Sequence, residues 1–103
     1  MDLSEKTIIS VQAIINTPVE MVWRYWTSVG FDFQGIYVNV IINELIEYII
    51  DDGRIVKIVF TDEINKTKVV ETFEAENTHS IEMQRSGWQS ILDSFKKYAE
   101  SKI

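Results

Sequence analysis

Cysteine is absent from this chain of 103 residues, and proline and histidine occur once each. Without cysteine there are no disulfides, no thiol nucleophile and no Cys-ligated zinc, which fits a reducing cytoplasm. Glycine is also scarce, with four residues, and no linker, repeat or low-complexity segment is present. A chain of this length builds one hydrophobic core, so we expect a single domain over residues 1–103.

Long apolar runs are missing as well. No run approaches the roughly 18 residues that cross a bilayer, so we expect no membrane span. The segment MDLSEKTIIS has no basic stretch before an apolar core, so we expect no signal peptide and a cytoplasmic protein. Acidic residues outnumber basic ones by 16 to 10, giving a net charge of −6. Because an acidic surface repels phosphates, neither nucleic acid nor an anionic membrane is an expected partner.

Motifs for catalysis and metal binding are also lacking. The chain has no phosphate-binding glycine loop, no nucleophile elbow and no HExxH. Asp51-Asp52 and Asp62-Glu63 lack metal-ligand spacing and suit turns instead. His79 precedes the last predicted helix without an evident partner, which indicates a solvated residue of the capping region. A solvated face also accounts for Glu71, Glu74 and Glu76. We therefore expect no catalytic residue, no metal, no cofactor and no enzymatic activity.

The segments that are present alternate between strand and helix patterns. Residues 6–15 alternate apolar and polar side chains, as in a half-buried strand. Thr17, Pro18 and Glu20 predict a capping box for a helix that runs to about Ser28. Further strands are predicted over 30–42, with Gly35 as a bulge or a close approach, and over 44–50, 54–60 and 67–75, with an Asp52-Gly53 hairpin after the second of these.

A long helix with apolar residues at helical spacing is predicted from Ser80 onward. Gly87 interrupts it at a cost of about 1 kcal/mol relative to alanine, which we interpret as a close approach of the helix backbone to the sheet. The order β-α-β-β-β-β-α predicts an α+β fold. In that fold an antiparallel sheet carries the C-terminal helix across one face.

Four segments carry a resemblance to a known family. They are the opening strand leading into NTPVEMVWRYWT, the strand FDFQGIYVNVI followed by NELIEY, the DDGR hairpin, and the closing helix with MQRSGWQSILDSFKKY. In this order they resemble the SRPBCC (START/Bet v-like) superfamily, in its branch similar to the activator of the heat-shock-protein-90 ATPase. The resemblance covers nearly the whole chain. It implies a helix-grip fold, often built around an apolar cavity.

One departure from the family pattern affects the sheet edge. Members of this branch usually place a second short helix and one further strand after the first helix, where this chain has only Ser28-Val29. By the resemblance, strand 6–15 pairs with strand 67–75 and the meander ends at strand 30–42, an apolar edge without lysine or proline. Such an edge is an aggregation hazard unless it is covered. We therefore expect a homodimer that pairs the edge residues Phe31, Phe33, Ile36, Val38 and Val40.

The shortening also affects the path of the chain. The missing strand would return the chain to the end of the sheet where strand 30–42 begins. A ten-residue strand spans roughly 33 Å and an eleven-residue helix roughly 16 Å, so the helix alone does not close that distance. Either the helix is re-routed along the sheet, or strand 6–15 and its helix pack onto a partner in a domain swap.

The aromatic residues give two interpretations. In the first, rings line a pocket for a small apolar ligand; in the second, they pack the core and a dimer interface. The leading functional hypothesis is a non-enzymatic ligand-binding or carrier module whose cavity is reduced or shared across a dimer. The alternative is a co-chaperone-like interaction domain without a cavity. An enzyme such as a cyclase or hydratase is the weakest, because no acid–base pair stands out. The candidate ligand-binding residues are Trp26, Phe33, Tyr37, Tyr48, Phe60, Trp88 and Phe95.

Overall fold

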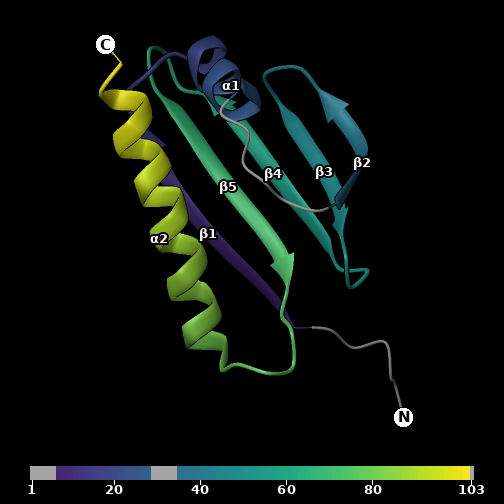
Figure 1. The fold of residues 1–103 in the computed structure, drawn as a ribbon. Coiled ribbons are helices and arrows are strands. Elements are labelled where there is room, and N and C mark those ends of the chain that lie inside the picture. The colour runs from purple at the N-terminus through teal and green to yellow at the C-terminus, as the bar shows by residue number, and fades with distance from the viewer. Residues whose placement is uncertain (1–6, 29–34, 103) are drawn as a thin grey trace.

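The computed structural model describes residues 7–28 and 35–102, which form an α+β domain (Figure 1). The predicted element order is confirmed. The elements are β1 (Ile8–Ile15), α1 (Val19–Ser28), β2 (Gly35–Ile41), β3 (Leu45–Ile50), β4 (Ile55–Asp62), β5 (Thr67–Glu74) and α2 (Ile81–Glu100).

The strands form one antiparallel sheet in the order β1-β5-β4-β3-β2. The predicted pairing of the first strand with the last, and the meander from there to β2, are confirmed. Figure 1 shows α2 lying along β1, while α1 sits at one end of the sheet and contacts α2 and β4. β1 and β2 run in the same direction, so β2 begins at the end of the sheet away from α1. Residues 29–34, which include Phe31 and Phe33, lie outside the described residues.

The core lies between the inner face of the sheet and the two helices. Alternate residues of β1 and β5 point inward, and Phe95 of α2 packs over them. Ser80 caps α2, because its Oγ accepts a hydrogen bond from the backbone N–H of Met83 at 3.1 Å. The fully buried side chains include Ile9, Ile15, Val22, Ile46, Val56, Ile58, Val69, Phe73 and Leu92.

The predicted capping box of α1 is wrong. Thr17 is turned into the core, where 3% of its surface is exposed and its Oγ1 has no hydrogen-bond partner among the described residues. The first helical hydrogen bonds run instead to the carbonyl of Pro18, from Met21 N and Val22 N. The hydroxyl of Thr67 donates to the Thr17 carbonyl at 2.8 Å, which holds the turn against β5. Burial of the threonine side chain therefore overrides its capping preference.

The hairpins follow the turn residues of the sequence. Gly53 has a φ of 89°, as the Asp52-Gly53 signal predicts, and its N–H donates to Ile50 O at 2.8 Å. In the β4–β5 turn both central residues, Ile64 and Asn65, have positive φ values of 56° and 63°. Two such residues are typical of a tight hairpin turn, for which Asn-Gly is the preferred pair. A β-branched isoleucine is strained there.

Replacing Ile64 should relieve this strain. Ile64→Asn is expected to raise the free energy of unfolding by about 1 kcal/mol, because left-handed backbone costs an ordinary L-residue about 1–2 kcal/mol and asparagine tolerates it better. Little packing is lost, since 84% of the Ile64 side chain is exposed. Urea unfolding measures the change, with Ile64→Val as the control that keeps the branched side chain. A less stable Ile64→Asn variant contradicts the turn geometry.

Candidate functional site

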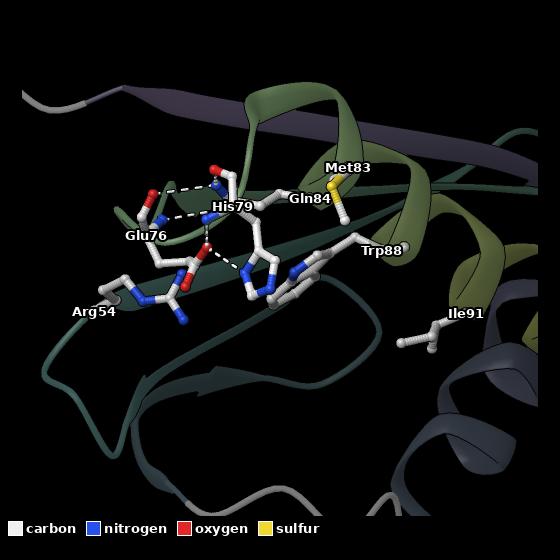
Figure 2. A pocket seen from close by; sticks show the side chains of 8 residues that line it. Arg54, Glu76, His79, Met83, Gln84, Trp88 and Ile91 are labelled. Carbon is white, nitrogen blue, oxygen red and sulfur yellow. Dashed lines mark hydrogen bonds and ion pairs between the residues drawn. The ribbon is translucent and has the colours of Figure 1, made fainter.

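An open groove lies beside the first half of α2, facing the start of β4 (Figure 2). It has a volume of about 380 Å³. Most of its lining comes from α2, and the rest comes from the β3–β4 hairpin and from the loop that precedes α2. The lining residues are Arg54, Glu76, His79, Met83, Gln84, Gly87, Trp88 and Ile91.

The apolar side of the groove is built on an aromatic stack. The ring of Trp88 lies on the ring of Phe73 with centroids 3.8 Å apart and planes at 14°, so β5 sets the position of the tryptophan. Met83 and Ile91 flank it on α2 and are 63% and 60% exposed. The large apolar side chains of Met83 and Ile91 thus face solvent beside the flat ring of Trp88. An apolar molecule placed here would cover all three.

The polar end of the groove is an ordered loop. Gln84 is buried and bonds to this loop three times: its Oε1 accepts from Glu76 N at 2.8 Å, and its Nε2 donates to Glu76 O and His79 O at 3.1 and 2.9 Å. His79 Nδ1 lies 2.8 Å from Glu76 Oε1, so the histidine has the partner that sequence analysis did not find. Hydrogen bonding from the His79 side chain keeps the pKa of Glu76 below its usual value.

Arg54 lies beside Glu76 at the polar end of the groove (Figure 2). Its Nε donates to Asp52 Oδ2 and its Nη1 donates to Glu74 O, both at 2.8 Å. Hydrogen bonds from Arg54 lower the pKa of Asp52, and the largest contribution comes from the backbone N–H of Arg54. The groove therefore combines an apolar wall with polar groups that already bond to one another. This arrangement suits holding and orienting a ligand more than attacking it.

Gly87 lies in the wall of the groove, and its predicted role is wrong. A Cβ added there meets no atom within 4 Å, so the helix backbone makes no close approach to the sheet at this point. Instead the missing side chain leaves open space between Met83 and Ile91, which stand one turn before and after it. The sequence did contain a signal for this groove. It is a mid-helix glycine with one apolar residue four positions before it and another four positions after it.

Glu71 is a second correction. It is not on a solvated face: 5% of its surface is exposed, and it belongs to the inward row of β5 with Val69 and Phe73. Burial raises the pKa of Glu71 to about 7. Glu74 lies on the other face of the strand, so these two glutamates do not share an environment. The alternation of β5 was visible in the sequence, but the hydrophobic pattern gave no reason to place an acid inside.

The predicted ligand-binding residues separate into three places. Trp26, Phe60 and Phe95 pack together near α1, with centroids 5.7 Å apart for Trp26–Phe60 and 4.7 Å for Trp26–Phe95. Tyr37 and Tyr48 face each other at 6.4 Å across β2 and β3. Trp88 of this predicted set lines the groove. The remaining residue, Phe33, lies outside the described part of the chain.

Sequence analysis missed Met83, Gln84, Arg54 and Glu76 as groove residues.

The β2 strand carries the predicted edge. Within the described ranges it pairs with β3 and with no other strand. A register shift falls between Tyr37 and Asn39, not at Gly35. Tyr37 and Val40 therefore pair with Tyr48 and Ile46 on the inner face of the sheet. The exposed apolar residues of this strand and its turn, called the β2 edge below, are Ile36, Tyr37, Val38, Val40, Ile41 and Ile42.

In 7–28 and 35–102, no three of the potential metal-ligating side chains come together. No helix within these ranges has the length and apolarity to cross a membrane.

Comparison with known proteins agrees with this architecture. The family model of activator of Hsp90 ATPase homolog 1-like proteins matches residues 28–100. The solution structure of an AHSA1-like protein from Aeromonas hydrophila is 29% identical, with a TM-score of 0.85 over 93% of this chain and 94% of that one. A protein from Cytophaga hutchinsonii is 34% identical, with a TM-score of 0.68 over 94% and 93% of the two chains.

A more distant structure shares the fold. A protein from Staphylococcus saprophyticus is 20% identical and has a TM-score of 0.76 over 94% of both chains. Among curated proteins, none matches the chain. The family match spans well over half of the sequence, and it agrees with the sheet and the long C-terminal helix. The chain therefore belongs to the family of activator of Hsp90 ATPase homolog 1-like proteins.

Proposed function

We propose that the protein binds a small apolar ligand in the groove beside α2 and acts as a binding or carrier module without catalysis. The observation that carries the proposal is the apolar wall of Met83, Trp88 and Ile91 around the open space at Gly87. Ligand pockets are typically concave, mostly apolar and equipped with a few fixed polar groups. The family, which commonly forms ligand-binding or co-chaperone-type domains, is consistent with this function.

The glycine supplies the test. N-phenyl-1-naphthylamine, an uncharged fluorescent probe, should bind the native protein, and Gly87→Leu should weaken binding at least about tenfold by filling the groove. The variant should remain folded, because leucine is a better helix former than glycine by about 1 kcal/mol. Ser86→Leu is the matched control, since Ser86 is exposed and does not line the groove. Unchanged binding by Gly87→Leu contradicts the proposal.

A second candidate function, assembly through the β2 edge, is favoured by a separate observation. Ile36 of β2 and Ile42 of the turn that follows it are 73% and 71% exposed. Among the described residues, β2 is also an edge strand with unpaired backbone groups on its outer side. Gly35–Asn43 contains no charged residue, although the chain carries a net charge of −6. A second copy can pair with this strand about a two-fold axis without bringing like charges together. We propose that the occupant of the β2 edge is another copy of this chain.

The form of this dimer is simple edge pairing. β1 pairs with β5 of its own chain, so the exchange of β1 between two chains stays a prediction. The missing helix and strand relative to other family members also stay a prediction.

A further inference from the structure

His79 is held by its own loop and by α2 at the polar end of the groove. Its backbone N–H donates to Glu76 Oε1 at 2.6 Å, and its Nδ1 lies 2.8 Å from the same oxygen. Its carbonyl accepts a hydrogen bond from Nε2 of the buried Gln84 at 2.9 Å. These bonds fix the backbone and the imidazole together, although 56% of the His79 side chain is exposed.

The bond to Glu76 determines which atom of the imidazole is available to a ligand. Hydrogen bonding from the His79 side chain keeps the pKa of Glu76 below its usual value, so this carboxylate is ionised at neutral pH. Because an ionised carboxylate only accepts hydrogen bonds, the proton of a neutral imidazole is assigned to Nδ1, and Nε2 then carries a lone pair. Among the residues that the structure describes, none forms a hydrogen bond to Nε2 of His79.

This free nitrogen lies on the groove side of the ring. His79 and Trp88 both line the groove, and Figure 2 shows the imidazole next to the indole, with Nδ1 toward Glu76. The two nitrogens of an imidazole point in nearly opposite directions. Nε2 is therefore directed away from Glu76, on the side of the ring where Trp88 lies. An acceptor atom thus stands at the edge of the apolar wall.

The charges at the polar end favour a neutral ligand group over an anion. Arg54 lines this end, but its Nε and Nη1 already donate to Asp52 and to the carbonyl of Glu74. The ionised Glu76 lies in the same lining, and the whole chain carries a net charge of −6. A carboxylate on the ligand would be repelled by these acids. A hydroxyl group avoids this repulsion and supplies the proton that Nε2 lacks.

We propose that His79 is the specificity-determining residue of this groove, and that its Nε2 accepts a hydrogen bond from a neutral hydroxyl group on an apolar, ring-sized ligand. The inference rests on the groove being a ligand site. The rings of the ligand lie against Trp88 and the open space at Gly87, and its hydroxyl group points toward His79. Glu76 is a positioning residue, because it holds the imidazole through Nδ1.

Three probes that share the naphthalene rings test this inference at pH 8, which is chosen so that the imidazole carries a single proton. Calorimetry should show that 2-naphthol binds the native protein about fivefold more tightly than 2-methoxynaphthalene, which has no donor. The anion 2-naphthoate should bind less tightly than 2-naphthol. His79→Phe keeps a flat ring without an acceptor, so it should bind 2-naphthol and 2-methoxynaphthalene with similar affinity.

The variants should keep the loop intact. The bonds from residue 79 to Gln84 and to Glu76 Oε1 that involve its backbone remain in His79→Phe. Asn77→Ala is the matched control, because Asn77 belongs to the same loop, is exposed and does not line the groove. It should keep the preference for 2-naphthol. Circular dichroism checks that each variant is folded, and the comparison of probes on the native protein stands without them.

The contrary outcomes are distinct. The role of His79 is overturned, while the groove remains a ligand site, by equal affinity of the native protein for 2-naphthol and 2-methoxynaphthalene or by tighter binding of 2-naphthoate. A preference that persists in His79→Phe, or one that Asn77→Ala also abolishes, overturns it as well. If N-phenyl-1-naphthylamine binds but no naphthalene probe does, the role of His79 alone is overturned. If none of the four compounds binds, both the groove and the role of His79 are overturned.

Discussion

Between pH 4.5 and 7 the free energy of unfolding should fall by up to about 3 kcal/mol because of Glu71 alone. Burial raises the pKa of this side chain from 4.5 to about 7 in the folded protein. The folded state therefore holds its proton more tightly than the unfolded state does. The stabilisation is complete below pH 4.5 and is lost as the pH rises through 7, where a charged carboxylate must stay inside the core.

Other carboxylates act at lower pH and in the opposite direction. Hydrogen bonds lower the pKa values of Asp52, Glu76 and Glu100, so their contribution to stability is lost only as the pH falls below the usual carboxylate range. They are already ionised in the window where Glu71 titrates. Tyr48, the other buried titratable group on the inner face, has its pKa raised by burial and then by Glu71, and it stays neutral in this window.

Chemical denaturation at several pH values measures the effect. Glu71→Gln should remove most of the slope between pH 5 and 7.5, because glutamine does not titrate. Glu71→Leu should be more stable than the native protein above pH 7, since no charge is then buried. Glu74→Gln is the matched control on the other face of β5 and should keep the native slope. A native slope of zero or of opposite sign contradicts the burial of Glu71.

The second large effect concerns assembly. The native protein should have a molar mass near twice the chain's 12.0 kDa, and Ile36→Lys should shift it to the monomer value at micromolar concentration. A lysine on an edge strand opposes strand pairing because its charge must stay in water. Ile36 is largely exposed, so the substitution should leave the fold of the single chain intact.

Light scattering over a dilution series measures this equilibrium. Ile8→Lys is the matched control, because Ile8 is also exposed but lies on β1, the opposite edge of the sheet. It should remain a dimer. A monomeric native protein contradicts pairing at the β2 edge, and dissociation by Ile8→Lys in place of Ile36→Lys moves the interface to β1.

Sequence patterns predicted the fold well because they report repeating local preferences. The alternation in residues 6–15, the Asp52-Gly53 turn and the long helix predicted from Ser80 onward all correspond to features of the structure. The sequence-based predictions failed where packing in the tertiary structure determines the position of a residue. Thr17 has a capping side chain that the core buries, and the register shift in β2 falls between Tyr37 and Asn39 and not at Gly35.

The candidate site was less predictable for the same reason. Trp88 was identified because aromatic residues commonly line pockets, but the space at Gly87 depends on which face of α2 meets the sheet. Glu71 was missed because an isolated acid in a strand is usually solvated. Its burial follows from its place in the inward row of β5, which the packing of the sheet determines and the local sequence does not.

The most direct test of the central claim is an NMR titration of the native protein with N-phenyl-1-naphthylamine, followed by amide and methyl shifts. If the ligand site is the groove, the largest shifts should appear at Met83, Gly87 and Trp88, with Ile36 and Val38 of the β2 edge unchanged. Shifts confined to the β2 edge, or no saturable shift at α2, contradict the account of this protein as a ligand-binding module.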